Sequence, residues 1–252
     1  MPTLDRAVLF TDDDVRISAV CVSAAEDVPT DLALVVAHGF TGSWRRPAVD
    51  AVMRGLRAHG AVVGFDFRGH GASGGHSTVG DREVRDLDAA VRWARALGHP
   101  RVATIGFSMG GGVVLRHAAL CGGVDAVVAV SAPARWYYRG TPSMRRVHYA
   151  IERRAGRAVA RFALRTRISP RAWDPVPLAP FEAATGISPT PLLVVHGDAD
   201  PYFPMDHPHQ IHDAAREPKE LWIEPGLGHA ENAVGPALVE RIGEWVRAHA
   251  AR

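Results

Sequence analysis

The stretch VATIGFSMGGGVVL, residues 102–115, places one polar hydroxyl, that of Ser108, between two apolar runs. The β-branched and aromatic residues before it predict a strand, and the apolar run after the glycines predicts a helix. In this setting the pattern G-x-S-x-G is typical of a tight, strained turn, in which glycines at 106 and 110 avoid side-chain clashes. Such a turn lifts the Ser108 hydroxyl above the edge of a sheet. Ser108 is therefore a candidate nucleophile.

The groups that such a nucleophile needs can also be found in the sequence. The start of a helix leaves backbone N–H groups unpaired, so the amide of Met109 would face an oxygen that becomes negative during attack. A serine hydroxyl is a weak nucleophile near neutral pH and needs a base, which an acid holds in place. Candidates follow in chain order. Asp198 and Asp200 come after one apolar run, in LLVVHGDADPYFP, and His229 comes after the next, in LWIEPGLGHAEN.

Apolar, β-rich runs alternate with helical patterns along most of the chain. Most of these runs are continuously apolar, as in strands that are covered on both faces. The alternation predicts an α/β fold with a mostly parallel central sheet, helices on both faces, and functional residues at the carboxyl ends of the strands. The expected strands are 16–22, 32–37, 61–67, 102–107, 126–131, 191–196 and 220–223. The expected helices are 47–59, 81–97, 109–120, 206–216 and 234–249.

The alternation fails once, between residues 133 and 186. Apolar residues at helical spacing cover 143–166, and a proline-rich stretch follows. We predict a mainly helical, arginine-rich cap at 133–186. It is inserted into one main domain that comprises residues 1–132 and 187–252.

The predicted cap is strongly basic. Between residues 135 and 171 eleven arginines stand against a single acid, Glu152. Two interpretations remain open. In the first, the arginines are a solvated helix face that reflects the composition, since Lys219 is the one lysine of the chain. Alternatively, they attract an anionic partner, such as a coenzyme A thioester, an acidic carrier protein or an anionic membrane surface. No recognised motif supports nucleic acid as the partner.

Five motifs together resemble the α/β-hydrolase superfamily, in its lipase, esterase and serine-aminopeptidase-like branch. They are AHGFTGS (37–43), DFRGHGAS (66–73), GFSMGG (106–111), HGDADPYFP (196–204) and GLGHAE (226–231). The resemblance spans about 30–131 and 188–250 and implies the α/β-hydrolase fold. It also implies Ser108 as the nucleophile, His229 as the general base and then acid, and Asp200 as the carboxylate that holds the imidazole.

The resemblance refines two of these assignments. Asp200 is preferred to Asp198 because the family pattern H-G-x-x-D places the acid three residues after the glycine, here Gly197. Asp198 is expected to bond backbone groups of its own turn. The resemblance implies that the backbone N–H groups of Phe40 and Met109 form the oxyanion hole.

These residues predict a serine hydrolase that cleaves a carboxylic ester of a small or medium acyl group through an acyl-enzyme intermediate. No metal or organic cofactor is expected. An acyl-thioesterase is the alternative favoured by the basic cap, and a peptidase or amidase comes third. Haloalkane and epoxide chemistry in this fold normally uses an aspartate as nucleophile, so Ser108 argues against both. The rival from another class is a non-catalytic receptor or interaction module, although such proteins usually lose one of the three residues found here.

Several other polar residues are expected to have structural roles. In MDHPHQIH, residues 205–212, Pro208 interrupts the run at a helix start, so we expect surface histidines rather than a metal site. The turn DFRGHGAS is expected to brace the loop beside the pocket. His38 and His196, each at a strand end, are expected to be structural or to line the pocket.

Composition limits the remaining possibilities. Cys21 and Cys121 lie in apolar segments and are expected to be buried free thiols. No apolar stretch of about 18 residues could span a bilayer, and the first residues lack the basic-then-apolar pattern of a secretory signal. We therefore expect a cytoplasmic protein.

Overall fold

Across residues 3–26, 28 and 31–250, which the computed structural model describes, the chain forms an eight-stranded sheet of order β1-β2-β4-β3-β5-β6-β7-β8. The pairs between β4 and β8 are parallel, and β2 is antiparallel to both β1 and β4. This confirms the predicted, mostly parallel sheet. The strands are β1 (Leu4–Phe10), β2 (Arg16–Val22), β3 (Leu32–Ala37), β4 (Ala61–Phe65), β5 (Arg101–Phe107), β6 (Ala126–Val130), β7 (Leu192–Gly197) and β8 (Lys219–Glu224).

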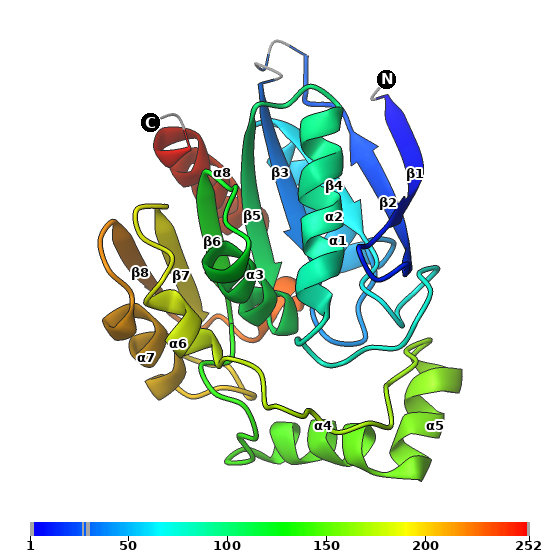
Figure 1. The fold of residues 1–252 in the computed structure, drawn as a ribbon. Coiled ribbons are helices and arrows are strands. Elements are labelled where there is room, and N and C mark those ends of the chain that lie inside the picture. Colours follow the sequence, from blue (N-terminus) through cyan, green and yellow to red (C-terminus); the bar gives the residue numbers. More distant parts are fainter. Residues whose placement is uncertain (1–2, 27, 29–30, 251–252) are drawn as a thin grey trace.

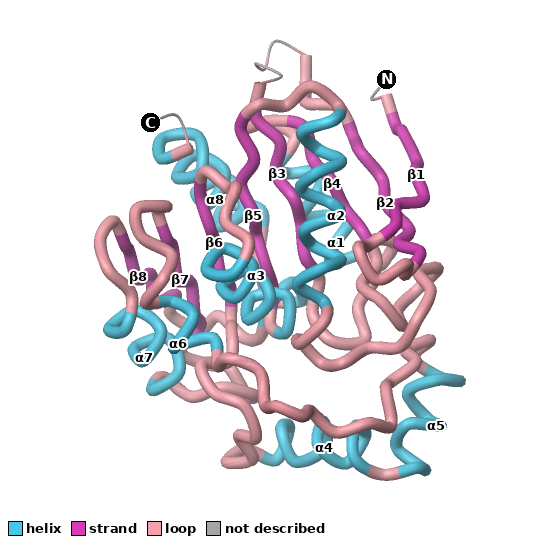
Figure 2. Tube along the Cα trace, viewed as in Figure 1, coloured by secondary structure: helices cyan, strands magenta, loops and turns pink. Residues whose placement is uncertain are grey.

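Helices cover both faces of the sheet. Figures 1 and 2 show α2 and α3 in front of the strands and α1 and α8 behind them. The helices are α1 (Pro47–Leu56), α2 (Glu83–Ala96), α3 (Met109–Leu120), α4 (Pro142–Glu152), α5 (Arg154–Ala163), α6 (Pro180–Ala184), α7 (Asp206–Ala214) and α8 (Pro236–His249), with a short 3₁₀ helix η1 (Ala230–Asn232).

Continuously apolar strands build a core on each side of the sheet. In β3 all six residues are buried. Since side chains alternate along a strand, the even-numbered residues of β3 pack with α1 and α8, and the odd-numbered residues pack with α2 and α3. This is the two-sided burial that the continuous runs predict.

Strand β1 is the element that the sequence analysis missed. It pairs only with β2 at the edge of the sheet, and Leu4, Val8 and Phe10 are exposed. An edge strand with outward-pointing apolar residues gives no buried, continuous run, so its sequence resembled a loop.

The segment predicted as a cap leaves the sheet after β6 and returns at β7, two neighbouring strands. Figure 1 shows its helices α4 and α5 beneath the carboxyl ends of the parallel strands. The helical pattern at 143–166 forms two helices and not one, because Arg153 is extended (φ −96°, ψ 139°). The two helices pack closely next to this break, since a Cβ at Gly156 of α5 would overlap the carbonyl oxygen of Tyr149 of α4. The division into two domains stays a prediction.

One expectation about the cysteines is wrong. Both thiols are free, but only Cys21 is buried, and Cys121 is exposed. The reason is that Cys121 is the C-cap residue of α3, where the helix ends at the surface. Within the described part of the chain, no helix combines the length and apolarity needed to cross a bilayer.

Candidate active site

Ser108 occupies the turn between β5 and α3 in a strained backbone conformation. Its φ is 51° and its ψ is −115°, a region that residues with a side chain rarely adopt. The flanking glycines are explained by backbone contacts across the turn. A Cβ at Gly106 would overlap the carbonyl of Gly110, and a Cβ at Gly110 would overlap that of Ala37. The Ser108 N–H donates to the Val130 carbonyl (2.9 Å) and ties the turn to β6.

The structure brings Ser108, His229 and Asp200 into one hydrogen-bonded chain. The Ser108 Oγ lies 2.9 Å from His229 Nε2, and His229 Nδ1 lies 2.7 Å from Asp200 Oδ2. Because a carboxylate can only accept, Nδ1 carries the proton and Nε2 faces the hydroxyl as an acceptor. The three side chains follow β5, β7 and β8, so the parallel sheet places them at one edge.

The Asp200 carboxylate is held ionised. Its side chain is fully buried, and its Oδ1 accepts from the backbone N–H groups of Tyr202 (2.7 Å) and Phe203 (3.1 Å). Burial opposes ionisation, but the His229 bond and these backbone N–H groups outweigh it and keep the pKa of Asp200 below its usual range. Asp198 instead accepts from the Gly226 N–H (2.6 Å) in the adjoining turn, as expected.

The two expected oxyanion donors lie in the wall of the same cavity as Ser108. Met109 is the first residue of α3, so its N–H has no intrahelical partner. Phe40 follows β3 in a loop that is fixed on both sides. The Gly39 N–H donates to Glu231 Oε1 (3.0 Å), and the Thr41 N–H donates to His70 Nε2 (3.2 Å).

A cavity of about 540 Å³ opens above Ser108. Its wall is mainly apolar and aromatic, and much of it comes from the segment between β6 and β7. Prominent lining residues are Trp136, Tyr138, Val147, Ile151, Trp173 and Tyr202. The Trp136 and Trp173 rings lie 5.1 Å apart, and each indole N–H is hydrogen-bonded to a backbone carbonyl. An apolar cavity with a few polar groups at one end is the usual form of a small-molecule site.

Residues 34–240 match the family model described as the alpha/beta hydrolase family. The chain belongs to this family. It is 26% identical over 257 residues to the monoacylglycerol lipase of Mycolicibacterium smegmatis, covering 86% of this chain and 88% of that protein.

Solved structures show the same fold as this α/β hydrolase. The esterase Pf2001 of Pyrococcus furiosus has a TM-score of 0.78 at 24% identity, covering 99% of this chain and 94% of that chain. The α/β hydrolase GrgF from Penicillium sp. sh18 also has a TM-score of 0.78, at 21% identity, covering 99% of this chain and 100% of that chain.

Glu231 is a site residue that the sequence analysis of this α/β hydrolase did not assign. Its carboxylate is buried and holds the Gly39 amide, and a Cβ at Gly39 would lie 3.1 Å from both carboxylate oxygens. The motif GLGHAE included Glu231, but nothing in the sequence indicates which distant backbone group the carboxylate meets. Glu231 therefore connects the loop after His229 to the loop that carries Phe40.

Buried neutral histidines support the same loops. His38 Nε2 accepts from the Phe67 N–H (3.1 Å), while His70 Nε2 accepts from Thr41. Burial lowers the pKa of both imidazoles to about 4, so they stay neutral and can accept. His196 is also buried and bonds the Phe203 carbonyl (2.9 Å). These histidines are structural.

The turn DFRGHGAS braces its surroundings, as expected. The buried Asp66 accepts from the Ser43 hydroxyl (2.6 Å) and from the backbone N–H groups of Trp44 (3.1 Å) and Ala72 (2.9 Å). Arg68 pairs with Asp13 and Asp86. The turn thus links the loop after β3 to the turn between β1 and β2 and to α2.

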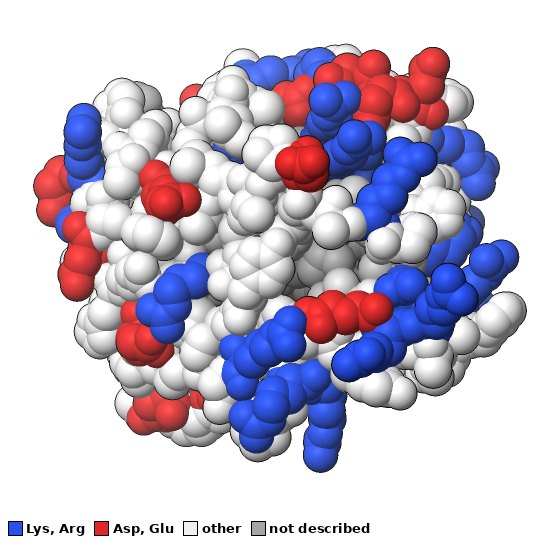
Figure 3. Space-filling view, turned by 60° about the horizontal axis from the view of Figure 1, so that its bottom comes forward, with Lys and Arg blue, Asp and Glu red and all other residues white. Residues whose placement is uncertain are grey.

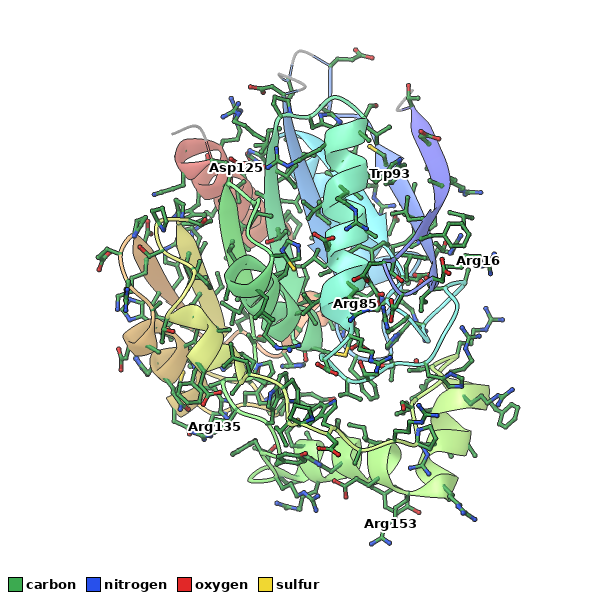
Figure 4. The ribbon with its side chains drawn as sticks, in the orientation of Figure 1. Arg16, Arg85, Trp93, Asp125, Arg135 and Arg153 are labelled. Atoms are coloured by element: carbon green, nitrogen blue, oxygen red, sulfur yellow. The ribbon has the colours of Figure 1, made fainter. Side chains whose placement is uncertain are left out.

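The expectation that all histidines of MDHPHQIH lie at the surface is wrong for His207. This ring is buried, and its Nδ1 accepts from the Ala134 N–H (2.9 Å). Next to it Arg135, labelled in Figure 4, pairs with Asp206. The reason is that the start of α7 packs against the chain leaving β6, a contact between segments far apart in the sequence.

The described residues include one group of side chains that could hold a metal ion. Asp88, His117 and Cys121 offer ligand atoms within 4.8 Å of one another. They lie on or next to α2 and α3 and do not line the cavity, and Asp88 already pairs with Arg92. This group is therefore separate from the candidate active site.

Proposed function

We propose that this α/β hydrolase is a serine esterase that cleaves a carboxylic ester through an acyl-enzyme intermediate. The observation that carries the proposal is the hydrogen-bonded chain from Ser108 through His229 to Asp200, beside an apolar cavity. Two of the similar proteins add support, since one is named a monoacylglycerol lipase and the other an esterase. The cytoplasmic location expected from the sequence stays a prediction.

In the acylation step the Ser108 Oγ attacks the ester carbonyl carbon while its proton moves to His229 Nε2. The carbonyl electron pair moves to the oxygen, which accepts hydrogen bonds from the Phe40 and Met109 amides. Loss of one such donor typically removes about 3 kcal/mol of transition-state stabilisation. When the tetrahedral intermediate collapses, the ester C–O bond breaks and the alcohol takes the proton from His229.

In the deacylation step a water molecule attacks the acyl carbon and gives one proton to His229 Nε2. Collapse breaks the bond to Ser108 Oγ, which recovers the proton, and the carboxylic acid leaves. The ionised Asp200 stabilises the imidazolium in both steps and keeps its ring in one orientation. The aromatic wall of the cavity provides room for the apolar part of the ester.

The first test is covalent labelling with a fluorophosphonate probe, together with hydrolysis of p-nitrophenyl esters of increasing chain length. We expect the wild type to be labelled and active, and Ser108→Ala to be folded, unlabelled and inactive. A folded wild type that is neither labelled nor active would contradict the proposal and favour a receptor on the same fold.

A second test separates the two aspartates of one turn. Asp200→Asn removes the acceptor of the His229 proton, so we expect kcat to fall about a thousandfold or more. The matched control Asp198→Asn alters a carboxylate that, among the described residues, bonds only the Gly226 amide, and its kcat should change by no more than a few fold. Equal losses in both variants would argue against Asp200 as the orienting acid.

A thioesterase is the second candidate, and two arginines favour it. Arg146 and Arg171 line the cavity, and neither has an acidic partner among the residues that the structure describes. They could attract the phosphates of a coenzyme A thioester. The discriminating measurement is kcat/KM for an anionic and a neutral substrate over a salt series. If salt affects both equally, or affects neither, electrostatic recruitment of the substrate is wrong.

A further inference from the structure

Helix α5 exposes an apolar stripe that no part of the described chain covers. Val159 is 59% exposed and Phe162 is 80% exposed, the highest value among the large exposed hydrophobic residues. Ala155 and Ala163 extend the same stripe, since these four residues follow helical spacing and all are exposed. Only Gly156 and Ala160 of α5 are buried. A single exposed apolar residue is unremarkable, but a stripe along one helix indicates an interaction surface.

Arginines occupy the other flank of the same helix. At 100° per residue, Arg154, Arg157 and Arg161 lie on the opposite side of the buried residues from the apolar stripe. The Arg161 guanidinium lies 5.6 Å from the Phe162 ring centroid, so the charged and apolar groups meet at the outer side of the helix. Arg154 and Arg161 have no acidic partner within the described residues.

The surroundings of α5 are also basic. Figure 3 shows Lys and Arg side chains gathered along the lower right of the face that α4 and α5 form. In Figure 4 Arg153, at the junction of the two helices, points away from the body of the protein. The single acid of this segment, Glu152, is already paired with Arg139 and bonded to His148. The positive charge of the other arginines is therefore available to an external partner.

The combination of these features selects among possible partners. A second copy docking through the same face would bring arginines against arginines, which is unfavourable. An acidic protein would satisfy the arginines but would give no reason for an exposed phenyl ring among them. An anionic lipid surface satisfies both, because apolar side chains enter the boundary between headgroups and acyl chains while arginines reach the phosphates.

We propose that α5 docks this protein on anionic membrane surfaces, lying in the interface with Val159 and Phe162 inserted and its arginines on lipid phosphates. Helix α4, which packs against α5, supplies Val147 and Ile151 to the cavity wall. Docking would therefore hold the cavity one helix away from the lipid. The proposal concerns binding and does not depend on the proposed esterase activity.

The experiment is co-sedimentation of the full chain with vesicles of phosphatidylcholine alone, or of equal parts phosphatidylcholine and phosphatidylglycerol. We expect at least tenfold stronger partition to the anionic vesicles, weakening as sodium chloride rises from about 0.05 M to about 0.5 M. Phe162→Ser should lower the partition by about tenfold. The double variant Arg154→Gln/Arg161→Gln should lower it by about twenty-five-fold, at about fivefold for each arginine.

Matched controls lie elsewhere on the surface. Leu120→Ser changes a side chain that is 56% exposed at the end of α3, and Arg216→Gln/Arg247→Gln removes two exposed arginines outside the cap. These variants should bind as the wild type does. All the substituted side chains are exposed, so circular dichroism and thermal melting should show unchanged folding.

Each other outcome overturns the proposal. Absence of partition, or equal partition to both vesicle types, rules out an anionic lipid surface. If the control variants lost as much partition to the anionic vesicles as the α5 variants do, net charge alone would cause the binding. A lipid-free dimer that Phe162→Ser dissociates would identify a second copy as the partner. Binding to polyglutamate, with no partition to vesicles, would identify an acidic protein.

Discussion

The strands of the central sheet and the helices α4 and α5 are held in very different ways. Every residue of β3 and β6 is buried, whereas α4 has no buried residue and α5 has two, Gly156 and Ala160. The groups proposed to do chemistry belong to the first region, and much of the cavity wall belongs to the second. Substitutions in the sheet should therefore change stability, and substitutions in α4 and α5 should change substrate choice or binding.

The largest expected effect compares two glycines that each pack against a backbone carbonyl. Gly110→Ala forces a Cβ onto the Ala37 carbonyl inside the packed sheet, and we expect a loss of about 3 kcal/mol in the free energy of unfolding. Gly156→Ala forces a Cβ onto the Tyr149 carbonyl, but α5 can move away, so the loss should stay below about 1 kcal/mol. Urea denaturation measures both. Equal losses would show that α5 is held as firmly as the sheet.

A second comparison uses pH. His38 and His70 have a folded-state pKa of about 4, below the unfolded value of about 6.5, so the unfolded state binds more protons as the pH falls. The stability that these two neutral rings contribute is thus fully present above about pH 6.5. It is lost as the pH falls toward 4, and the free energy of unfolding is lower by about 1.4 kcal/mol for each ring at pH 5.5.

The control for this effect lies in α4. Both ring nitrogens of His148 face acceptors, the Glu152 carboxylate and the Tyr138 carbonyl, so this ring, unlike those of His38 and His70, accepts no backbone N–H. His148→Gln should therefore keep the wild-type loss of stability between pH 7.5 and pH 5.5 in urea denaturation. If the stability of His148→Gln did not change over this pH range, the pH sensitivity would lie in α4 and not in His38 and His70.

A third comparison truncates one valine in each region. Val128 in β6 is fully buried, so Val128→Ala should lower the free energy of unfolding by about 2 kcal/mol. Val147 in α4 is partly exposed and lines the cavity, so Val147→Ala should lower it by less than about 0.5 kcal/mol. Val147→Ala should instead change KM for long-chain esters. An unchanged chain-length preference would mean that α4 does not contact the substrate.

The smallest expected effect concerns strain at the proposed nucleophile. At a φ of 51° a glycine is relaxed and an alanine is strained, so Ser108→Gly should be about 1 kcal/mol more stable than Ser108→Ala. Both variants should be inactive, so the difference reports backbone strain alone. Equal melting temperatures would mean that the turn relaxes when the hydroxyl is removed.

Local patterns in the sequence predicted most of the sheet and the position of the candidate site. The apolar runs became β2 to β8, and strands that are buried on both faces, such as β3 and β6, leave a clear signal in the sequence. The glycines around Ser108 predicted a turn that backbone overlaps at Gly106 and Gly110 now explain. The chain order of Ser108, Asp200 and His229 placed all three at one sheet edge.

Features that depend on contacts between distant segments were not predictable. Glu231 reaches the Gly39 amide, and His207 is buried by the chain at Ala134, and neither contact has a local signature. The break at Arg153 also escaped the helical spacing, because a short extended junction leaves the periodicity of both helices intact. The exposed strand β1 lacked the apolar run that identified the others.

The adjacency of β6 and β7 has a consequence for how this chain can be varied. The segment between them begins and ends on neighbouring parallel strands, so a graft of different length or composition could replace its α4 and α5 without altering the pairing of β1 to β8. One sheet of this kind could carry many different inserted segments at this position. The proposed substrate selectivity and the proposed membrane docking could then be exchanged together, while the hydroxyl, the imidazole and the carboxylate stay where they are.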